Sequence, residues 1–248
     1  KIGGTETIGN NGVTLSSAST TEVTTGNALT VGGVITGSGR LTKSGNGTLI
    51  LSGANDYSGG TVVSAGTLQG TASTIQGALT NNATVNFNQA SDGTYSGGMV
   101  GTGKLVKSGS GVLTVSGANS HSGNTDINAG TISVAAGASL GSTNLYIGPD
   151  NSSGSATLNI SDTDGGTTVA NNVIIRAGGG TRTVGAANTS GVNEYSGTLY
   201  LDGDATLSAA AGGSVRFSSG ILQGSLLNEV DVAISGGGTV EFSGGDNN

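Results

Sequence analysis

Short runs of alternating aliphatic and polar residues recur along the chain. Each run is only a few residues long and is bounded by glycine, asparagine or serine. Because side chains alternate between the two faces of a strand, this pattern predicts short β-strands with one buried side. The runs return at a spacing of about 20 residues, at 13–15, 29–35, 84–87, 145–147, 156–160, 173–175, 198–201, 215–217 and 232–234.

One stretch of this pattern occurs twice. LTKSGNGTLILSGANDYSGGTVVSAGTL at 41–68 returns as LVKSGSGVLTVSGANSHSGNTDINAGTI at 105–132. Aligning 37–70 with 101–134 needs no gap and gives 18 identities in 34 positions. A truncated third copy occupies 236–248. Three coils of about 21 residues would account for the interval between the full copies, and periods of this size indicate a solenoid.

The differences between the two copies sort by the direction of the side chain. Five positions stay aliphatic and are predicted to point inward: Leu41, Leu49, Leu51, Val63 and Leu68, matched by Leu105, Leu113, Val115, Ile127 and Ile132. Positions between them change character and are predicted to point outward: Thr42 to Val106, Ile50 to Thr114 and Val62 to Asp126.

Stacking of similar coils explains why the motif is repeated. Each strand is too short to be stable alone, but stacked coils bury the aliphatic side chains in columns and complete the backbone hydrogen bonds. We therefore predict an all-β fold: one right-handed parallel β-helix of about twelve coils over residues 1–248, with three short strands in each coil. A β-sandwich is the alternative, but it would not require the same sequence to return at so long an interval.

Composition narrows the choice of class. The 248 residues include 49 glycines, one proline and no cysteine, and 9% are charged. Glycine does not occupy every third position, which excludes collagen, and abundant Thr, Val and Ile oppose disorder. The absence of cysteine excludes a disulfide framework and thiolate metal sites.

The charge balance argues against nucleic acid as a partner. The net charge is −7, and the eight Lys and Arg residues form no cluster. No run approaches the length of apolar sequence that a membrane-spanning helix needs. The chain begins with Lys1 and shows no leader segment, so we expect it to be a piece of a longer protein.

The repeated motif resembles the passenger-associated transport repeat of bacterial type V autotransporters. The pattern LxKxGxGTLxLSGxNxYSGxTxVxxGTL matches 41–68 throughout, 105–132 with His121 at the tyrosine position, and 238–247 at its beginning. The resemblance implies a right-handed β-helix passenger, similar to surface adhesins, that is exported through the outer membrane and displayed outside a Gram-negative cell. It also implies a C-terminal membrane barrel in the parent protein, which we expect to lie outside these residues.

The titratable residues of the motif predict no nucleophilic site. A triad needs a histidine beside a nucleophile, and the only histidine, His121, aligns with Tyr57 in the first copy. A structural role is the simpler interpretation of that exchange. Lys43 and Lys107 precede glycine corners, where we expect them to neutralise nearby acids such as Asp56.

Two acidic pairs are the remaining candidates for chemistry. Asp162 and Asp164 resemble the start of a calcium loop that lacks its later ligands, and Asp202 and Asp204 have the same spacing. Acidic residues before glycine are also what turns require. We therefore predict no catalytic residue, no metal site and no cofactor.

The few aromatic residues divide by their surroundings. Three lie in strand patterns and are expected inside the coils: Phe87, Phe217 and Phe242. Tyr57 and Tyr195 each precede a Ser-Gly corner, where an exposed tyrosine offers a ring and a hydroxyl. Together with His121, they are our candidates for surface contact.

Three classes of function follow. The leading one is a non-catalytic passenger segment on the bacterial cell surface, acting as an adhesin, a stalk or a self-associating rod, with a glycan or protein receptor as partner. A polysaccharide lyase or hydrolase would instead need a cleft that combines acids with Arg176 or Arg182. An ice-binding solenoid would need regular ranks of threonine on one flat face, and TTEVTT at 20–25 is not sustained.

Overall fold

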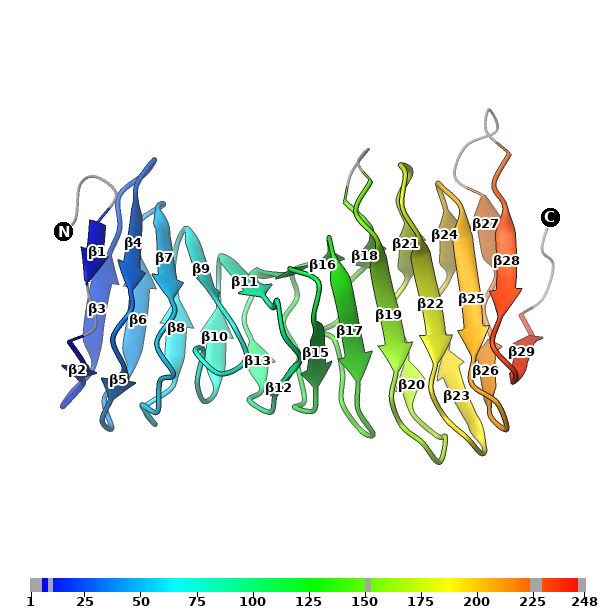
Figure 1. The fold of residues 1–248 in the computed structure, drawn as a ribbon, viewed down its shortest axis with the longest axis horizontal. Coiled ribbons are helices and arrows are strands. Elements are labelled where there is room, and N and C mark those ends of the chain that lie inside the picture. The colour runs from blue at the N-terminus through cyan, green and yellow to red at the C-terminus, as the bar shows by residue number, and fades with distance from the viewer. Residues whose placement is uncertain (1–5, 9–10, 150–152, 224–228, 245–248) are drawn as a thin grey trace.

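The computed structural model describes residues 6–8, 11–149, 153–223 and 229–244. In these residues every regular element is a β-strand, and every strand pairing is parallel. Successive coils stack along one axis into an elongated rod, with β1 near one end and β29 near the other (Figure 1). No helix of the described residues is long and apolar enough to cross a membrane.

The rod has three faces, which the chain visits in a fixed order. The first face is a continuous sheet of eleven described strands: β1 (Glu6–Ile8), β4 (Ala28–Val31), β7 (Thr48–Leu51), β9 (Thr67–Gly70), β11 (Thr84–Asn88), β14 (Lys104–Ser108), β16 (Thr125–Ile127), β18 (Leu145–Ile147), β21 (Val173–Ile175), β24 (Leu199–Leu201) and β27 (Ile221–Gln223). Each coil contributes one strand to it, so the prediction of a parallel β-helix with about twelve coils is confirmed.

The second face comes directly after the first face in each coil. Near the N-terminus it has β2 (Val13–Thr14) and β5 (Ile35–Thr36). Further along it has a sheet of seven described strands: β12 (Gly93–Tyr95), β15 (Val112–Val115), β17 (Gly130–Val134), β19 (Ala156–Ile160), β22 (Arg182–Ala186), β25 (Ala205–Ala209) and β28 (Val232–Ser235).

The third face completes each coil, before the chain returns to the first face. Its first sheet contains β3 (Ser19–Glu22), β6 (Leu41–Ser44), β8 (Thr61–Val63), β10 (Leu79–Asn81) and β13 (Met99–Val100). Its second sheet contains β20 (Thr168–Val169), β23 (Val192–Tyr195), β26 (Ser214–Phe217) and β29 (Thr239–Phe242). Backbone hydrogen bonds between loops, such as Ser120 N to Met99 O (2.8 Å), continue the stacking between these two sheets.

The two full copies of the repeat lie on different faces. The first copy turns its Ser-Gly corner between β6 on the third face and β7 on the first. The second copy turns the same corner between β14 on the first face and β15 on the second. The truncated copy continues the series between β28 and β29, on the second and third faces. Each copy is therefore advanced by one face around the axis.

Coil length explains this rotation. Leu41 pairs with Thr61, Thr61 with Leu79 and Leu79 with Met99, so three coils end short of Leu105, where the second copy begins. The prediction that the interval between the copies holds three whole coils and nothing more is wrong, because the coils between the copies are shorter than that division requires. The interval holds three coils and one additional face.

The core is a set of side-chain columns inside the rod. All ten aliphatic positions predicted to point inward are buried, with exposures of 3% or less. On the first face, Leu29, Leu49 and Leu68 stand in one column because β4, β7 and β9 pair in register. Burial of such side chains contributes roughly 1.5–3 kcal/mol each. The predicted facing of the repeat is confirmed for these positions.

Glycine is required where the chain turns between faces. Gly45 and its counterpart Gly109 have φ angles of 71° and 75°, in the left-handed region that other residues rarely adopt. A Cβ atom on Gly45 would lie 2.3 Å from Val23 O of the preceding coil. The corner therefore excludes side chains both by conformation and by the close approach of the preceding coil.

Candidate functional site

Tyr57 and His121 lie inside the rod, not on its surface. Tyr57 is 1% exposed and His121 is fully buried, so the prediction that they contact a partner is wrong. Tyr57 Oη is hydrogen-bonded to Thr61 Oγ1 at 2.7 Å, and His121 Nε2 is hydrogen-bonded to Thr125 Oγ1 at 3.1 Å. The histidine replaces the tyrosine in the same internal contact. Burial lowers the pKa of His121 and raises that of Tyr57.

Tyr195 is also buried, at 1% exposure, which contradicts its predicted role in surface contact. Its hydroxyl donates to Gly185 O at 2.8 Å, and its ring stacks on Phe217 with centroids 5.3 Å apart. Phe242 stacks in turn on Phe217 at 5.8 Å but stays 44% exposed, whereas we expected it inside. Phe87 is buried as predicted. The three rings from 195 to 242 line up because β23, β26 and β29 pair in register.

The acidic pair at Asp162 and Asp164 stabilises a turn. Asp162 accepts hydrogen bonds from Thr167 Oγ1 (2.8 Å) and from the backbone N of Asp164 (3.2 Å). Its backbone carbonyl accepts from Asn193 Nδ2 of the next coil at 2.9 Å. Among the described residues, no group of three or more His, Asp or Glu side chains is close enough to hold a metal ion.

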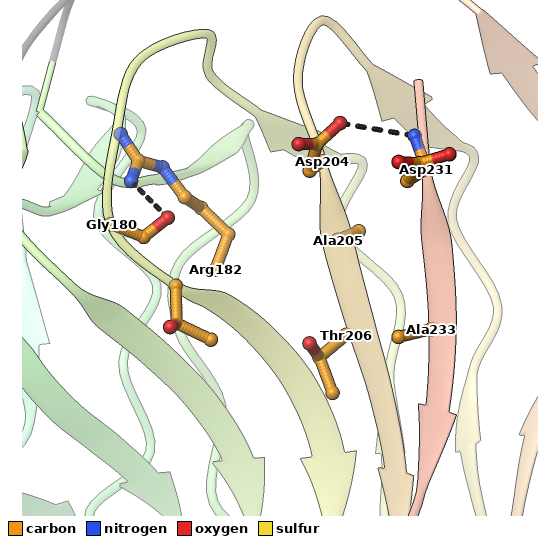
Figure 2. A pocket seen from close by; sticks show the side chains of 8 residues that line it. Gly180, Arg182, Asp204, Ala205, Thr206, Asp231 and Ala233 are labelled. Carbon is orange, nitrogen blue, oxygen red and sulfur yellow. Dashed lines mark hydrogen bonds between the residues drawn. The ribbon is translucent and has the colours of Figure 1, made fainter. Parts of the chain in front are cut away.

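A hollow of about 210 Å³ lies where β22, β25 and β28 begin. Asp204 and Asp231 line it together with Arg182 (Figure 2). The Arg182 guanidinium points into the Gly-rich loop, where it donates to the carbonyls of Gly180 (2.9 Å) and Gly179. Asp204 Oδ1 accepts from the backbone N of Asp231 at 3.0 Å. Acids and arginine are near each other, but each of these hydrogen bonds has a backbone group as its partner.

A cluster of charged and aromatic side chains covers part of the first face. Asp126 points outward as predicted, yet it is only 3% exposed. It forms ion pairs with Lys104 of β14, the neighbouring strand in the sheet, and with Arg176 (3.5 Å). The Arg176 guanidinium also lies 4.3 Å from the centre of the Tyr146 ring, a cation–π contact. These three neighbours shield the carboxylate from solvent.

The sequence analysis missed this cluster. The strands β14, β16 and β18 are neighbours in the first-face sheet and carry Lys104, Asp126 and Tyr146. Knowledge of how these strands pair would therefore have placed the three residues together. Arg176 follows β21, whose residue Val173 pairs with Leu145 across a longer coil. That greater length is not marked by any change in the hydrophobic pattern.

The two motif lysines have the same buried environment. Lys43 Nζ donates to the carbonyls of Ser44 (2.8 Å), Gly45 (2.6 Å) and Ala65 (3.1 Å). Lys107 Nζ makes the three equivalent bonds at 2.9, 2.7 and 3.1 Å. Both side chains are fully buried with backbone carbonyls as their hydrogen-bond partners, whereas we predicted that they neutralise nearby acids such as Asp56. Burial lowers the pKa of Lys107 to about 8, an effect that Asp92 opposes.

Comparison with known proteins shows what the two full copies of the repeat are similar to. The family model described as passenger-associated-transport-repeat matches residues 41–69 and 105–134. The chain carries two passenger-associated transport repeats. The adhesin BmaC autotransporter of Brucella suis biovar 1 (strain 1330) is 33% identical over 153 residues, covering 54% of this chain. The chain spans about 4% of that relative's length. No solved structure matches the chain significantly.

Besides its lysine, the transport repeat has a buried asparagine that links neighbouring coils. Asn55 Oδ1 accepts from Ile35 N of the coil before (2.8 Å), and its Nδ2 donates to Thr74 O of the coil after (2.6 Å). Asn119 Oδ1 likewise accepts from Met99 N at 2.9 Å. The asparagine of the motif therefore joins successive coils where regular strand pairing is interrupted.

The transport repeat is thus a structural module. Its lysine, its asparagine and its tyrosine or histidine are all buried and all bonded to backbone or side-chain groups of the rod. The side chains that can meet a partner are the outward ones, and several of these differ between the two copies, such as Ile50 and Thr114. A partner can therefore bind only to the outer faces of the rod and not to these buried motif residues.

Proposed function

We propose that this chain is a non-catalytic passenger segment of an autotransporter adhesin, displayed on the bacterial cell surface and acting through its outer faces. The observation that carries the proposal is that one chain combines a continuous three-faced β-solenoid with two transport repeats. The alignment with a protein named as an autotransporter adhesin supports the same conclusion.

The buried state of the motif residues supports a mechanical role. A rod of stacked coils presents long faces to its surroundings, and neighbouring coils are joined by backbone hydrogen bonds and by side chains such as Lys43 and Asn55. Outward positions tolerate change, as the exchange of Val62 for Asp126 between copies shows. Such a scaffold can vary its surface for adhesion without losing its core.

Polysaccharide cleavage is the less favoured candidate. Arg182, which a lyase would use at the substrate, is only 1% exposed and is bonded to loop carbonyls. Arg176 pairs with Asp126 and covers Tyr146. The acids at 162 and 204 are bonded to turn backbone. We expect the purified chain to show no hydrolysis or elimination on acidic or neutral polysaccharides, with or without calcium.

Adherence of whole cells tests the proposal. Cells that produce the longer protein to which this segment belongs would be compared with cells in which residues 11–244 are deleted in frame. We expect the deletion to reduce adherence to epithelial monolayers at least tenfold while the remaining passenger is still detected on the cell surface.

Two results would contradict the proposed role in adhesion. Unchanged adherence with normal surface display would contradict a role in adhesion. Turnover of a polysaccharide by the purified chain that is lost in the Asp162→Asn/Asp164→Asn variant would favour the enzymatic alternative instead.

A further inference from the structure

The second face of the rod carries an outer surface without charge. The seven-stranded sheet from β12 to β28 pairs in an uninterrupted parallel register. We call its solvent-accessible outward-facing positions the hydroxyl face: Thr94, Val112, Thr114, Thr131, Thr157, Asn159, Thr183, Thr206, Ser208, Ala233 and Ser235. None of these eleven residues is ionisable.

Threonine is aligned in a rank on this face. Thr131, Thr157, Thr183 and Thr206 are direct partners on four consecutive strands. Each offers a methyl group and a hydroxyl that both donates and accepts hydrogen bonds. The regular threonine rank that the sequence did not show at 20–25 is therefore present here, because pairing aligns residues that are a whole coil apart in the chain.

The other two faces differ in charge. The first face carries Lys104 and Asp126 on its strands, and the third carries Glu194, Arg216 and Glu241. The acids Asp204 and Asp231 lie at the rim of the hydroxyl face, where β25 and β28 begin. An uncharged centre with a charged rim is the arrangement found in protein interfaces.

We propose that the hydroxyl face is the surface through which two copies of this chain associate side by side. The inference rests on the proposed display at the cell surface and adds to it a contact between two displayed copies. With a net charge of −7, two copies repel each other, and they approach with least repulsion where the surface has no charge. Threonine and serine are self-complementary donors and acceptors, which suits a contact between identical surfaces.

The area of the hydroxyl face determines how strongly two copies are expected to associate. Seven strands spaced at about 4.8 Å, with about five residues each, give roughly 500 Å² per copy. A pair would bury about 1,000 Å² in total, which is near the lower limit for a specific interface. The association is therefore weak in solution, and many parallel copies on one cell surface would strengthen it by multivalency.

Sedimentation velocity of the full chain at rising concentration tests the proposal. Thr157 lies on β19, the middle strand of the sheet, so Thr157→Lys places like charges opposite each other. We expect the wild-type chain to dimerise and Thr157→Lys to weaken dimerisation at least tenfold. An equimolar mixture of Thr157→Lys and Thr157→Glu should recover it, because opposite charges then meet.

The matched control is Thr30→Lys, at an outward position on the first face. It should dimerise like the wild type, and all variants should keep the wild-type melting temperature. Equal weakening by Thr30→Lys, or wild-type association of Thr157→Lys, would overturn the proposal. A wild-type chain that stays monomeric would also overturn the proposal. This includes a monomeric chain that binds ice and shows thermal hysteresis. Adherence to host cells does not depend on this contact, so a monomeric chain that still supports adherence refutes only this inference.

Discussion

Adjacent residues in one strand of this rod have opposite environments. Leu49 is 1% exposed inside the coil, whereas Ile50 beside it points outward and is half-buried. The same alternation separates Met99, at 1% exposure, from Val100, at 47%. The direction of a side chain therefore decides its contribution to stability more than its hydrophobicity does.

Substitution of these two neighbours should give very different results. Leu49→Asp buries an unpaired charge in a column of aliphatic side chains, and we expect it to destabilise the rod by about 4 kcal/mol or more. Ile50→Asp should change the unfolding free energy by no more than about 0.5 kcal/mol. Chemical denaturation of both variants measures the difference. Similar losses in both would refute the assigned facing.

His121 should make stability depend on pH. Burial lowers its pKa below 6.5 in the folded chain, while the unfolded chain takes up the proton near that value. Its contribution is therefore present above pH 6.5 and is lost as the pH falls through the folded pKa. Because the chain has one histidine, its NMR titration can be followed without overlap. His121→Tyr, the residue of the first repeat, should remove this pH dependence, and a His121 titration at or above 6.5 would contradict it.

These examples show what single residues allow us to predict. Alternation correctly placed inside the ten motif aliphatics predicted to point inward. It also places Lys43 inward, but its charge led us to expect it to neutralise a nearby acid. The three carbonyls that receive its ammonium come from a corner and from the next coil, which no local pattern displays. Tyr57 and Tyr195 precede Ser-Gly corners, where the period of two ends and exposure cannot be deduced.

Strands and corners behave as replaceable units in this fold. Lys43 pairs with Val63 in the next coil, so residues 45–64 make up one coil. Deletion of 45–64 joins Ser44 to Ala65 in the same register, and we expect the shortened rod to fold cooperatively. Deletion of 45–54 removes half a coil and turns the remaining strands away from their partners. Circular dichroism and thermal unfolding distinguish the two, and equal destabilisation would argue against independent coils.

The repeat was recognised from sequence, but its position on the rod was not. The interval between its copies is close to three coils of a size usual for solenoids, yet the coils between the copies are shorter, as the pairing of Thr61 with Leu79 shows. A small error in each coil accumulates until the second copy lies one face further on. Later coils are longer, as the pairing of Leu145 with Val173 shows, and they carry no signal in the hydrophobic pattern because the added residues lie in loops.

The whole molecule is a rod whose interior is fixed and whose outer faces differ in chemistry. The first face carries an ion-pair and aromatic cluster at Asp126, the second carries the hydroxyl face, and the third carries the ion pair of Arg216 with Glu241. Rotation of the transport repeat by one face per copy moves the same corner around the axis. A displayed rod therefore offers a different surface in each direction.

Cysteine labelling on intact cells tests surface display and facing together. The chain has no cysteine of its own, so Met99→Cys and Val100→Cys each introduce one thiol within one strand. In cells that produce the full-length protein, we predict that a membrane-impermeant maleimide labels Val100→Cys at once and Met99→Cys only after unfolding. Labelling of Val100→Cys only after cell lysis would contradict surface display, and equal labelling of both positions on intact cells would contradict the β-solenoid.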